Sequence, residues 1–130
     1  MKGATTDTTT SSIAIAAARA ADDKKATDTL VLDVGDILAI TEYFVITSAS
    51  NSRLARTVVD EVEKQLKEQF GVAPRSVEGL DDARWILLDY GDLVVHVFLD
   101  EAREYYALDR LWGDAPSLDW QVVAPKSATG

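Results

Sequence analysis

The sequence predicts a small α/β (α+β) domain in which a mixed β-sheet of about five strands packs against helices. Three observations lead to this fold class. Short apolar runs rich in β-branched residues recur along the chain, one long amphipathic segment separates them, and two of the runs flank a tight turn. The length of 130 residues corresponds to one domain, and 47% hydrophobic residues are enough to form a core.

The N-terminal region predicts a tail followed by a helix. Residues 1–11 are rich in Thr and Ser and almost lack large apolar side chains, so burial would not offset the loss of backbone entropy. We therefore expect a flexible tail. Residues 12–25 are Ala-rich and predict a helix capped by Ser11 or Ser12. A signal peptide is the less favoured interpretation, because Arg19 interrupts the apolar run.

Two strands and the clearest helix of the chain follow. Residues 29–34 and 42–47 are nearly continuous apolar runs, which is typical of strands that are covered on both faces. Residues 51–70 carry apolar side chains at steps of three and four and predict a helix with one apolar stripe. Ser50 is the expected cap of this helix, and Gly71 is expected to end it.

The second half of the chain predicts a β-hairpin. Residues 76–78 form a possible short edge strand, and residues 84–90 and 93–99 flank a turn at Gly91-Asp92. If the turn has two residues, Leu88 lies opposite Val95 and Ile86 lies opposite Val97. A short helix from Asp100 to about Tyr105 follows.

Alternation sorts the hairpin side chains onto two faces. One face is almost wholly aliphatic and is expected to lie beneath the long helix. The other mixes aromatic residues with an acid and a histidine, so we expect it to be partly open and to contact another protein. In the alternative, residues 105–112 cover this mixed face and make Trp85 and Phe98 core residues. The aliphatic face comprises Ile86, Leu88, Tyr90, Leu93, Val95 and Val97, and the mixed face Trp85, Leu87, Asp89, Val94, His96 and Phe98.

The C-terminal residues 114–130 predict a second tail. Within it, an apolar group could instead add one more strand or a docked segment; this group consists of Leu118, Trp120, Val122 and Val123.

Composition narrows the classes of function. The 13 basic and 22 acidic residues give a net charge of −9, which disfavours direct binding to nucleic-acid phosphates. No run is long enough to span a membrane, and the lack of cysteine excludes disulfides and thiolate metal sites. A single histidine and no phosphate-binding glycine loop disfavour a catalytic or metal site, although a Ser-His pair between His96 and the 47–52 segment stays open. The residues therefore favour a binding module with no cofactor.

Three segments carry a resemblance to a known family. They are ITEYFVITSASNSR at 40–53, WILLDYGDLVVHVF at 85–98 and REYYALDRLW at 103–112. Together with Val77-Glu78-Gly79 they resemble the ribosomal silencing factor family, RsfS, which is related to plant Iojap. The resemblance spans residues 12–113 and implies a nucleotidyltransferase-like domain without the catalytic motif. It implies a cytoplasmic protein that binds the large ribosomal subunit through ribosomal protein fourteen (uL14), blocks the small subunit from joining and represses translation under nutrient limitation. A homodimer is implied for the free protein.

The resemblance also assigns residues. The family's partner-binding positions fall on Trp85, Asp89, Asp92, His96 and Phe98, and the residue at the hairpin tip, apolar in relatives, is Tyr90; these six are the predicted contact residues.

Two other functions remain as alternatives. The first is an assembly factor of the large subunit that makes the same contacts. The second is an active nucleotidyltransferase, which is less favoured because the chain contains no Asp-x-Asp and reads Ser-Ala-Ser-Asn at 48–51 in place of the Gly-Ser pair of such enzymes.

Overall fold

A mixed six-stranded sheet forms the centre of the molecule in a computed structural model that describes residues 9–38 and 40–121. The expected fold class is confirmed, with six strands rather than about five. In chain order the elements are α1 (Thr10–Asp23), β1 (Thr27–Asp33), β2 (Tyr43–Ala49), α2 (Ser52–Phe70), β3 (Ser76–Glu78), β4 (Trp85–Asp89), β5 (Leu93–Leu99), α3 (Asp100–Tyr106), α4 (Leu108–Leu111) and β6 (Ser117–Leu118).

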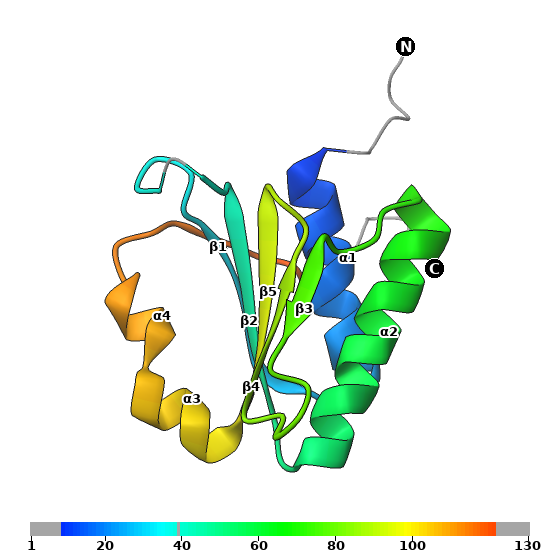
Figure 1. The fold of residues 1–130 in the computed structure, drawn as a ribbon. Coiled ribbons are helices and arrows are strands. Elements are labelled where there is room, and N and C mark those ends of the chain that lie inside the picture. The colour runs from blue at the N-terminus through cyan, green and yellow to red at the C-terminus, as the bar shows by residue number, and fades with distance from the viewer. Residues whose placement is uncertain (1–8, 39, 122–130) are drawn as a thin grey trace.

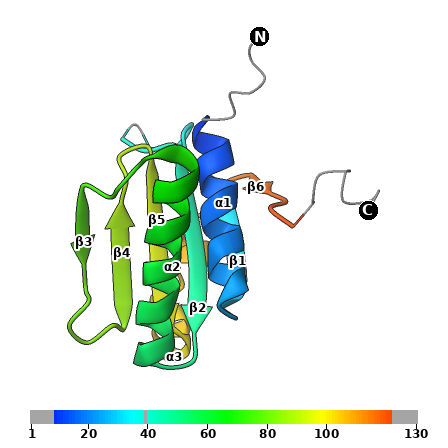
Figure 2. The same ribbon diagram turned by 90° about the vertical axis from the view of Figure 1, so that its right-hand side faces the viewer.

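The strand order is β3-β4-β5-β2-β1-β6. Only the central pair, β2 and β5, runs parallel, and the other neighbouring strands run antiparallel. Helices α1 and α2 cover one face of the sheet, and α3 and α4 lie on the other (Figure 1). Figure 2 shows that β3 and β4 extend beyond α2 at one edge of the sheet, so the helical layer on that side stops short of this edge.

The first helix begins at Thr10, two residues before the expected start at residue 12. The side chain of Thr9 accepts a hydrogen bond from the backbone N–H of Ser12 at 3.3 Å, so Thr9 is the N-cap rather than Ser11 or Ser12. Residues 10 and 11 of the expected tail therefore belong to α1, and residues 1–8 lie outside the described part of the chain.

The long helix α2 is confirmed, with one change at its start. Asn51 has an extended backbone, and its Oδ1 accepts from the N–H of Leu54 at 2.8 Å, which makes Asn51 the cap in place of Ser50. Gly71 ends the helix as expected, in the left-handed conformation that glycine adopts at little cost.

Each face of the sheet contributes to its own apolar cluster. The cluster beneath α1 and α2 contains Ile86, Leu88, Val95 and Val97, as the alternation of the hairpin predicts. The opposite cluster, beneath α3 and α4, is built from larger side chains and includes Leu32, Phe44, Ile46 and Phe98.

The segment after α4 docks on the far edge of the sheet. Strand β6 pairs with β1, placing Leu118 opposite Val31. The indole Nε1 of Trp120 donates to the backbone oxygen of Thr29 at 2.9 Å. Leu118 and Trp120 thus form the docked segment that was the alternative to a tail, whereas residues 122–130, including Val122 and Val123, lie outside the described residues.

Candidate functional site

The hairpin has the register that its sequence predicts. Ile86 pairs with Val97 and Leu88 pairs with Val95, and the N–H of Tyr90 donates to the carbonyl of Leu93 at 2.8 Å. The mixed face of β4 and β5 therefore lies on the same side of the sheet as α3 and α4.

The two helices divide this mixed face into a covered and an accessible part. Phe98 has no exposed surface and His96 retains only 4%, because both lie over the centre of the sheet, under α3 and the rings around it. Trp85, Leu87 and Val94 remain half-buried. The face is thus open around Trp85, as the first expectation has it, while Phe98 is buried as in the alternative, and His96 is buried with it.

Trp85 is the centre of the accessible part. Its ring stacks on Phe98 with the centroids 4.9 Å apart. The ring centroid of Tyr106, at the end of α3, lies 4.8 Å from that of Trp85, and Tyr106 is 46% exposed. The sequence reasoning did not include Tyr106 among the contact residues, although it lies in the REYYALDRLW segment that carries the family resemblance. We call the accessible group, which consists of Trp85, Leu87, Val94 and Tyr106, the Trp85 surface.

His96 joins the buried and accessible parts. Its Nδ1 accepts a hydrogen bond from the indole Nε1 of Trp85 at 3.1 Å. Burial lowers the pKa of His96 to about 4, so the imidazole is neutral near pH 7 and its proton must be on Nε2. Nε2 is buried and has no hydrogen-bond partner among the residues that the structure describes, while the ring of Phe44 lies 4.6 Å away in an edge-to-face arrangement.

The two acids of the hairpin turn have different surroundings. Asp89 accepts from the N–H of Gly91 at 2.8 Å and pairs with Arg75 at 3.6 Å, so its carboxylate stabilises the turn. The side chain of Asp92 is exposed, and its backbone oxygen accepts from the N–H groups of Glu42 and Tyr43 at 2.9 and 3.1 Å. Only Asp92 presents a carboxylate that is free of these turn contacts.

Tyr90 lies on the other side of the sheet. Its ring packs against the cluster beneath α2, as strand alternation requires. Its hydroxyl is buried without a hydrogen-bond partner among the described residues, and this burial, with the nearby charge of Glu63, raises its pKa. Tyr90 therefore does not join the Trp85 surface.

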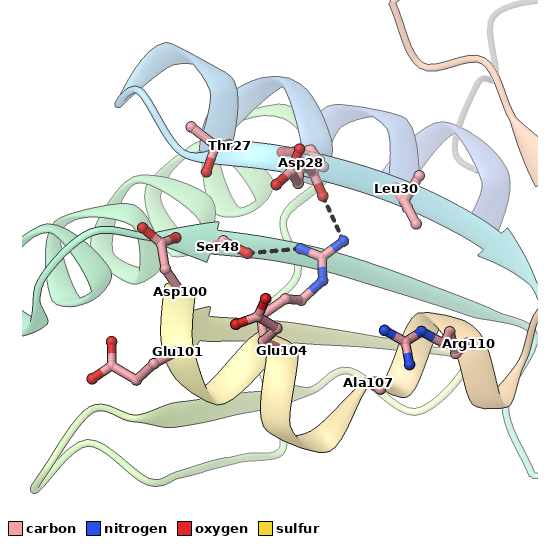
Figure 3. A pocket seen from close by; sticks show the side chains of 11 residues that line it. Thr27, Asp28, Leu30, Ser48, Asp100, Glu101, Glu104, Ala107 and Arg110 are labelled. Carbon is pink, nitrogen blue, oxygen red and sulfur yellow. Dashed lines mark hydrogen bonds between the residues drawn. The ribbon is translucent and has the colours of Figure 1, made fainter.

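A separate pocket of about 980 Å³ lies between β1, β2 and α3 (Figure 3). Across it, Arg103 donates to the hydroxyl of Ser48 and to the backbone oxygen of Asp28, both at 2.8 Å. The Ser48 hydroxyl is thus bonded to a guanidinium rather than to His96. The lining carries four carboxylates against two guanidinium groups, which does not favour a triphosphate; these residues are Asp28, Asp100, Glu101, Glu104, Arg103 and Arg110.

The described residues contain neither a group of metal ligands nor a membrane-spanning helix. Within residues 9–38 and 40–121, no three His, Asp or Glu side chains are grouped so that they could hold a metal ion. In the same part of the chain, no helix has the length and apolar character needed to cross a membrane.

The chain is similar to known proteins of one family. Residues 7–130 match the family profile described as "Ribosomal silencing factor during starvation". A ribosomal silencing factor of Bacillus subtilis is 44% identical over 103 residues, which is 79% of this chain and 86% of that protein. A crystal structure of a Chromobacterium violaceum protein superimposes with a TM-score of 0.76 at 31% identity and covers 89% of this chain and 95% of that one.

Two organellar proteins are also similar over part of their length. The chloroplastic protein Iojap of maize is 34% identical over 112 residues, which is 83% of this chain and 46% of that protein. A mouse protein named "Mitochondrial assembly of ribosomal large subunit protein 1" is 34% identical over 94 residues, which is 68% of this chain and 40% of that protein.

Proposed function

Because the chain belongs to the ribosomal silencing factor family, we propose that it binds the large ribosomal subunit through ribosomal protein fourteen (uL14) and so prevents the small subunit from joining. This action represses translation in the cytoplasm when nutrients are scarce, and it requires no catalysis and no cofactor. The names of the family profile and of the bacterial relative support silencing during starvation, and the name of the mouse relative supports contact with a large subunit.

The observation that carries the proposal is the Trp85 surface. A half-buried tryptophan in contact with an exposed tyrosine, with half-buried Leu87 next along the same face of β4 and Val94 on the same face of β5, has the composition of an interface core. Trp and Tyr contribute most strongly when a partner removes them from water. Trp85, Leu87, Val94 and Tyr106 are therefore the proposed direct contacts, while Phe98 and His96 support them from below.

Charge favours a protein partner over bare RNA. The net charge of −9 would be repelled by phosphates but attracted to a basic ribosomal protein. Asp92 is exposed near the hairpin tip and is the proposed partner for a basic side chain, whereas Asp89 and Tyr90 shape the turn from within. Raising the salt concentration is expected to weaken binding chiefly through slower association.

The test is co-sedimentation of the purified protein with large ribosomal subunits. Trp85→Ala is expected to weaken binding by more than about tenfold, as is common when a central interface tryptophan is truncated. Trp120→Ala is the matched control, because it removes the same residue type from the opposite edge of the sheet. Circular dichroism of both variants confirms that they are folded. Equal binding of wild type and Trp85→Ala would contradict the proposed contact surface.

A second candidate function is assembly of the large subunit, and the name of the mouse relative is the observation that favours it. The same contacts would serve both functions, so a subunit-joining assay separates them. A silencing factor blocks the joining of mature subunits in proportion to its occupancy, whereas an assembly factor leaves the joining of mature subunits unchanged.

We also propose that the free protein self-associates through the Trp85 surface. Sedimentation velocity of the wild type and Trp85→Ala tests this: the variant is expected to shift towards monomer. An identical distribution for the two proteins would exclude self-association through Trp85.

A further inference from the structure

We propose that His96 is a positioning residue: by accepting the hydrogen bond of the Trp85 indole, it holds that ring in the orientation in which the partner receives it. The inference rests on the proposed function, because it concerns how the Trp85 surface is prepared for binding. It also gives His96 a role that differs from direct contact, which its burial prevents.

The side chain of Trp85 has one hydrogen bond to the residues that the structure describes. Phe98 stacks beneath the ring and Tyr106 lies beside it, but ring contacts of this kind allow an indole to slide and turn within the stack. The bond from Nε1 to the Nδ1 of His96, at 3.1 Å, fixes which edge of the indole points inward. His96 itself is held between Phe44 and the neighbouring strands, so the acceptor does not move with Trp85.

Stability alone does not explain a histidine at this position. Its Nε2 is buried without a hydrogen-bond partner among the described residues, and an unpaired buried donor is unfavourable. Leu or Phe would fill the same apolar cluster without that penalty. What an aliphatic side chain cannot supply is an acceptor at the Nδ1 position, and that is the property the Trp85 indole uses.

A fixed ring raises affinity because less side-chain freedom is lost on binding. Ordering one large side chain at an interface corresponds to a weakening of about five- to tenfold, near the upper end for a single side chain. We therefore expect His96→Leu to weaken large-subunit binding by this factor. His96→Asn is expected to stay within about threefold of the wild type, since its Oδ1 can accept at nearly the Nδ1 position.

The experiment combines binding with a signal from the indole itself. The indole N–H resonance of Trp85, identified by its loss in Trp85→Phe, is followed by NMR in the wild type, His96→Leu and His96→Asn. A hydrogen-bonded indole N–H resonates downfield and exchanges slowly. His96→Leu is expected to move this resonance and speed its exchange, and His96→Asn is expected to restore both. Ile46→Val is the matched control, because Ile46 is buried, pairs with His96 across the strands and does not bond the indole.

Each outcome decides the proposal. A Trp85 indole signal that is unchanged in His96→Leu would overturn it, as would equal losses of affinity in His96→Leu and Ile46→Val. If His96→Leu does not fold, His96→Asn decides alone: wild-type exchange of the indole N–H supports the positioning role, and fast exchange overturns it. Failure of the wild type to bind large subunits would contradict the proposed function, while the NMR comparison would still establish whether His96 orients Trp85.

Discussion

At the scale of single residues, burial determines what the polar side chains of the hairpin can do. His96 and Asp89 both lie on the mixed face, and both are hydrogen-bonded within the chain. His96 is neutral and bonded to Trp85, and Asp89 is bonded to the turn and to Arg75. The accessible chemistry is left to the side chains around them, with the ring of Trp85 at the centre.

The pKa of His96 gives a prediction about stability and pH. In the folded protein this pKa is about 4, below the value near 6.5 of an unfolded chain. Between pH 6.5 and about pH 4, the histidine is protonated in the unfolded state but neutral in the folded state. The free energy of unfolding therefore falls as the pH drops through this range, and the loss of stability is complete below the pKa of the folded state. Between pH 7 and pH 4.5 this amounts to about 2 kcal/mol.

The measurement is urea denaturation of the wild type and His96→Leu at pH 7 and pH 4.5. Carboxylates titrate in both proteins, so the histidine contribution is the part of the pH effect that His96→Leu lacks. The same pH dependence in both proteins would mean that His96 is not buried in its neutral form.

At the scale of elements, the loop between β3 and β4 determines where Trp85 begins its strand. Arg56 of α2 donates to the backbone oxygen of Leu80 from Nε and Nη2 at 3.1 and 2.9 Å, and to that of Asp81 at 2.7 Å. Gly79 passes so close to Trp85 that an added Cβ would lie 2.1 Å from its carbonyl oxygen. A helix on one face of the sheet thus holds the loop that leads into the candidate site on the other.

This close approach predicts an unequal effect of two glycine substitutions. Gly79→Ala combines a positive φ of 87° with a backbone clash, and we expect it to lower the free energy of unfolding by about 3 kcal/mol or more. Gly71→Ala is the control, since Gly71 also has a positive φ but a Cβ there meets nothing within 4 Å, and we expect a loss of about 1 kcal/mol. Chemical denaturation compares them, and equal losses would show that the contact with Trp85 is relieved by movement of the loop.

At the scale of the whole molecule, two layers of helices enclose a sheet whose last strand is the C-terminal segment. Strand β6 pairs with β1, the N–H of Asp33 donates to the carbonyl of Pro116 at 2.7 Å, and Trp120 bonds to Thr29. The carbonyl of Trp120 also accepts from Nε of Arg19 in α1 at 3.4 Å. The segment therefore joins the sheet to the first helix.

Ending the chain at Gly113 is expected to destabilise the domain. It removes β6 and the packing of the partly buried Trp120, and we expect the loss to be about 2 kcal/mol or more. Trp120→Ala removes only the side chain and is expected to lose part of this amount. Thermal unfolding of the three proteins is the measurement. A truncated chain as stable as the full chain would show that the segment adds no stability.

The hairpin is the part of the site that could be predicted from local sequence. Its register follows from the turn at Gly91-Asp92 and from strict alternation, so Leu88 and Val95 meet on the buried face without reference to the rest of the chain. The same alternation places Tyr90 on that face. The long helix is equally local, because its apolar spacing and the glycine after it depend on neighbouring residues only.

Local sequence by itself therefore determined the long helix, the main strands, the pairing of the hairpin and the two faces it presents. The tertiary structure alone decided which part of the mixed face is accessible. Helices α3 and α4 fold back over Phe98 and His96 but leave Trp85 at their edge, where Tyr106 meets it. Periodicity assigns a side chain to a face, but the covering of that face depends on packing between distant segments, which periodicity does not encode.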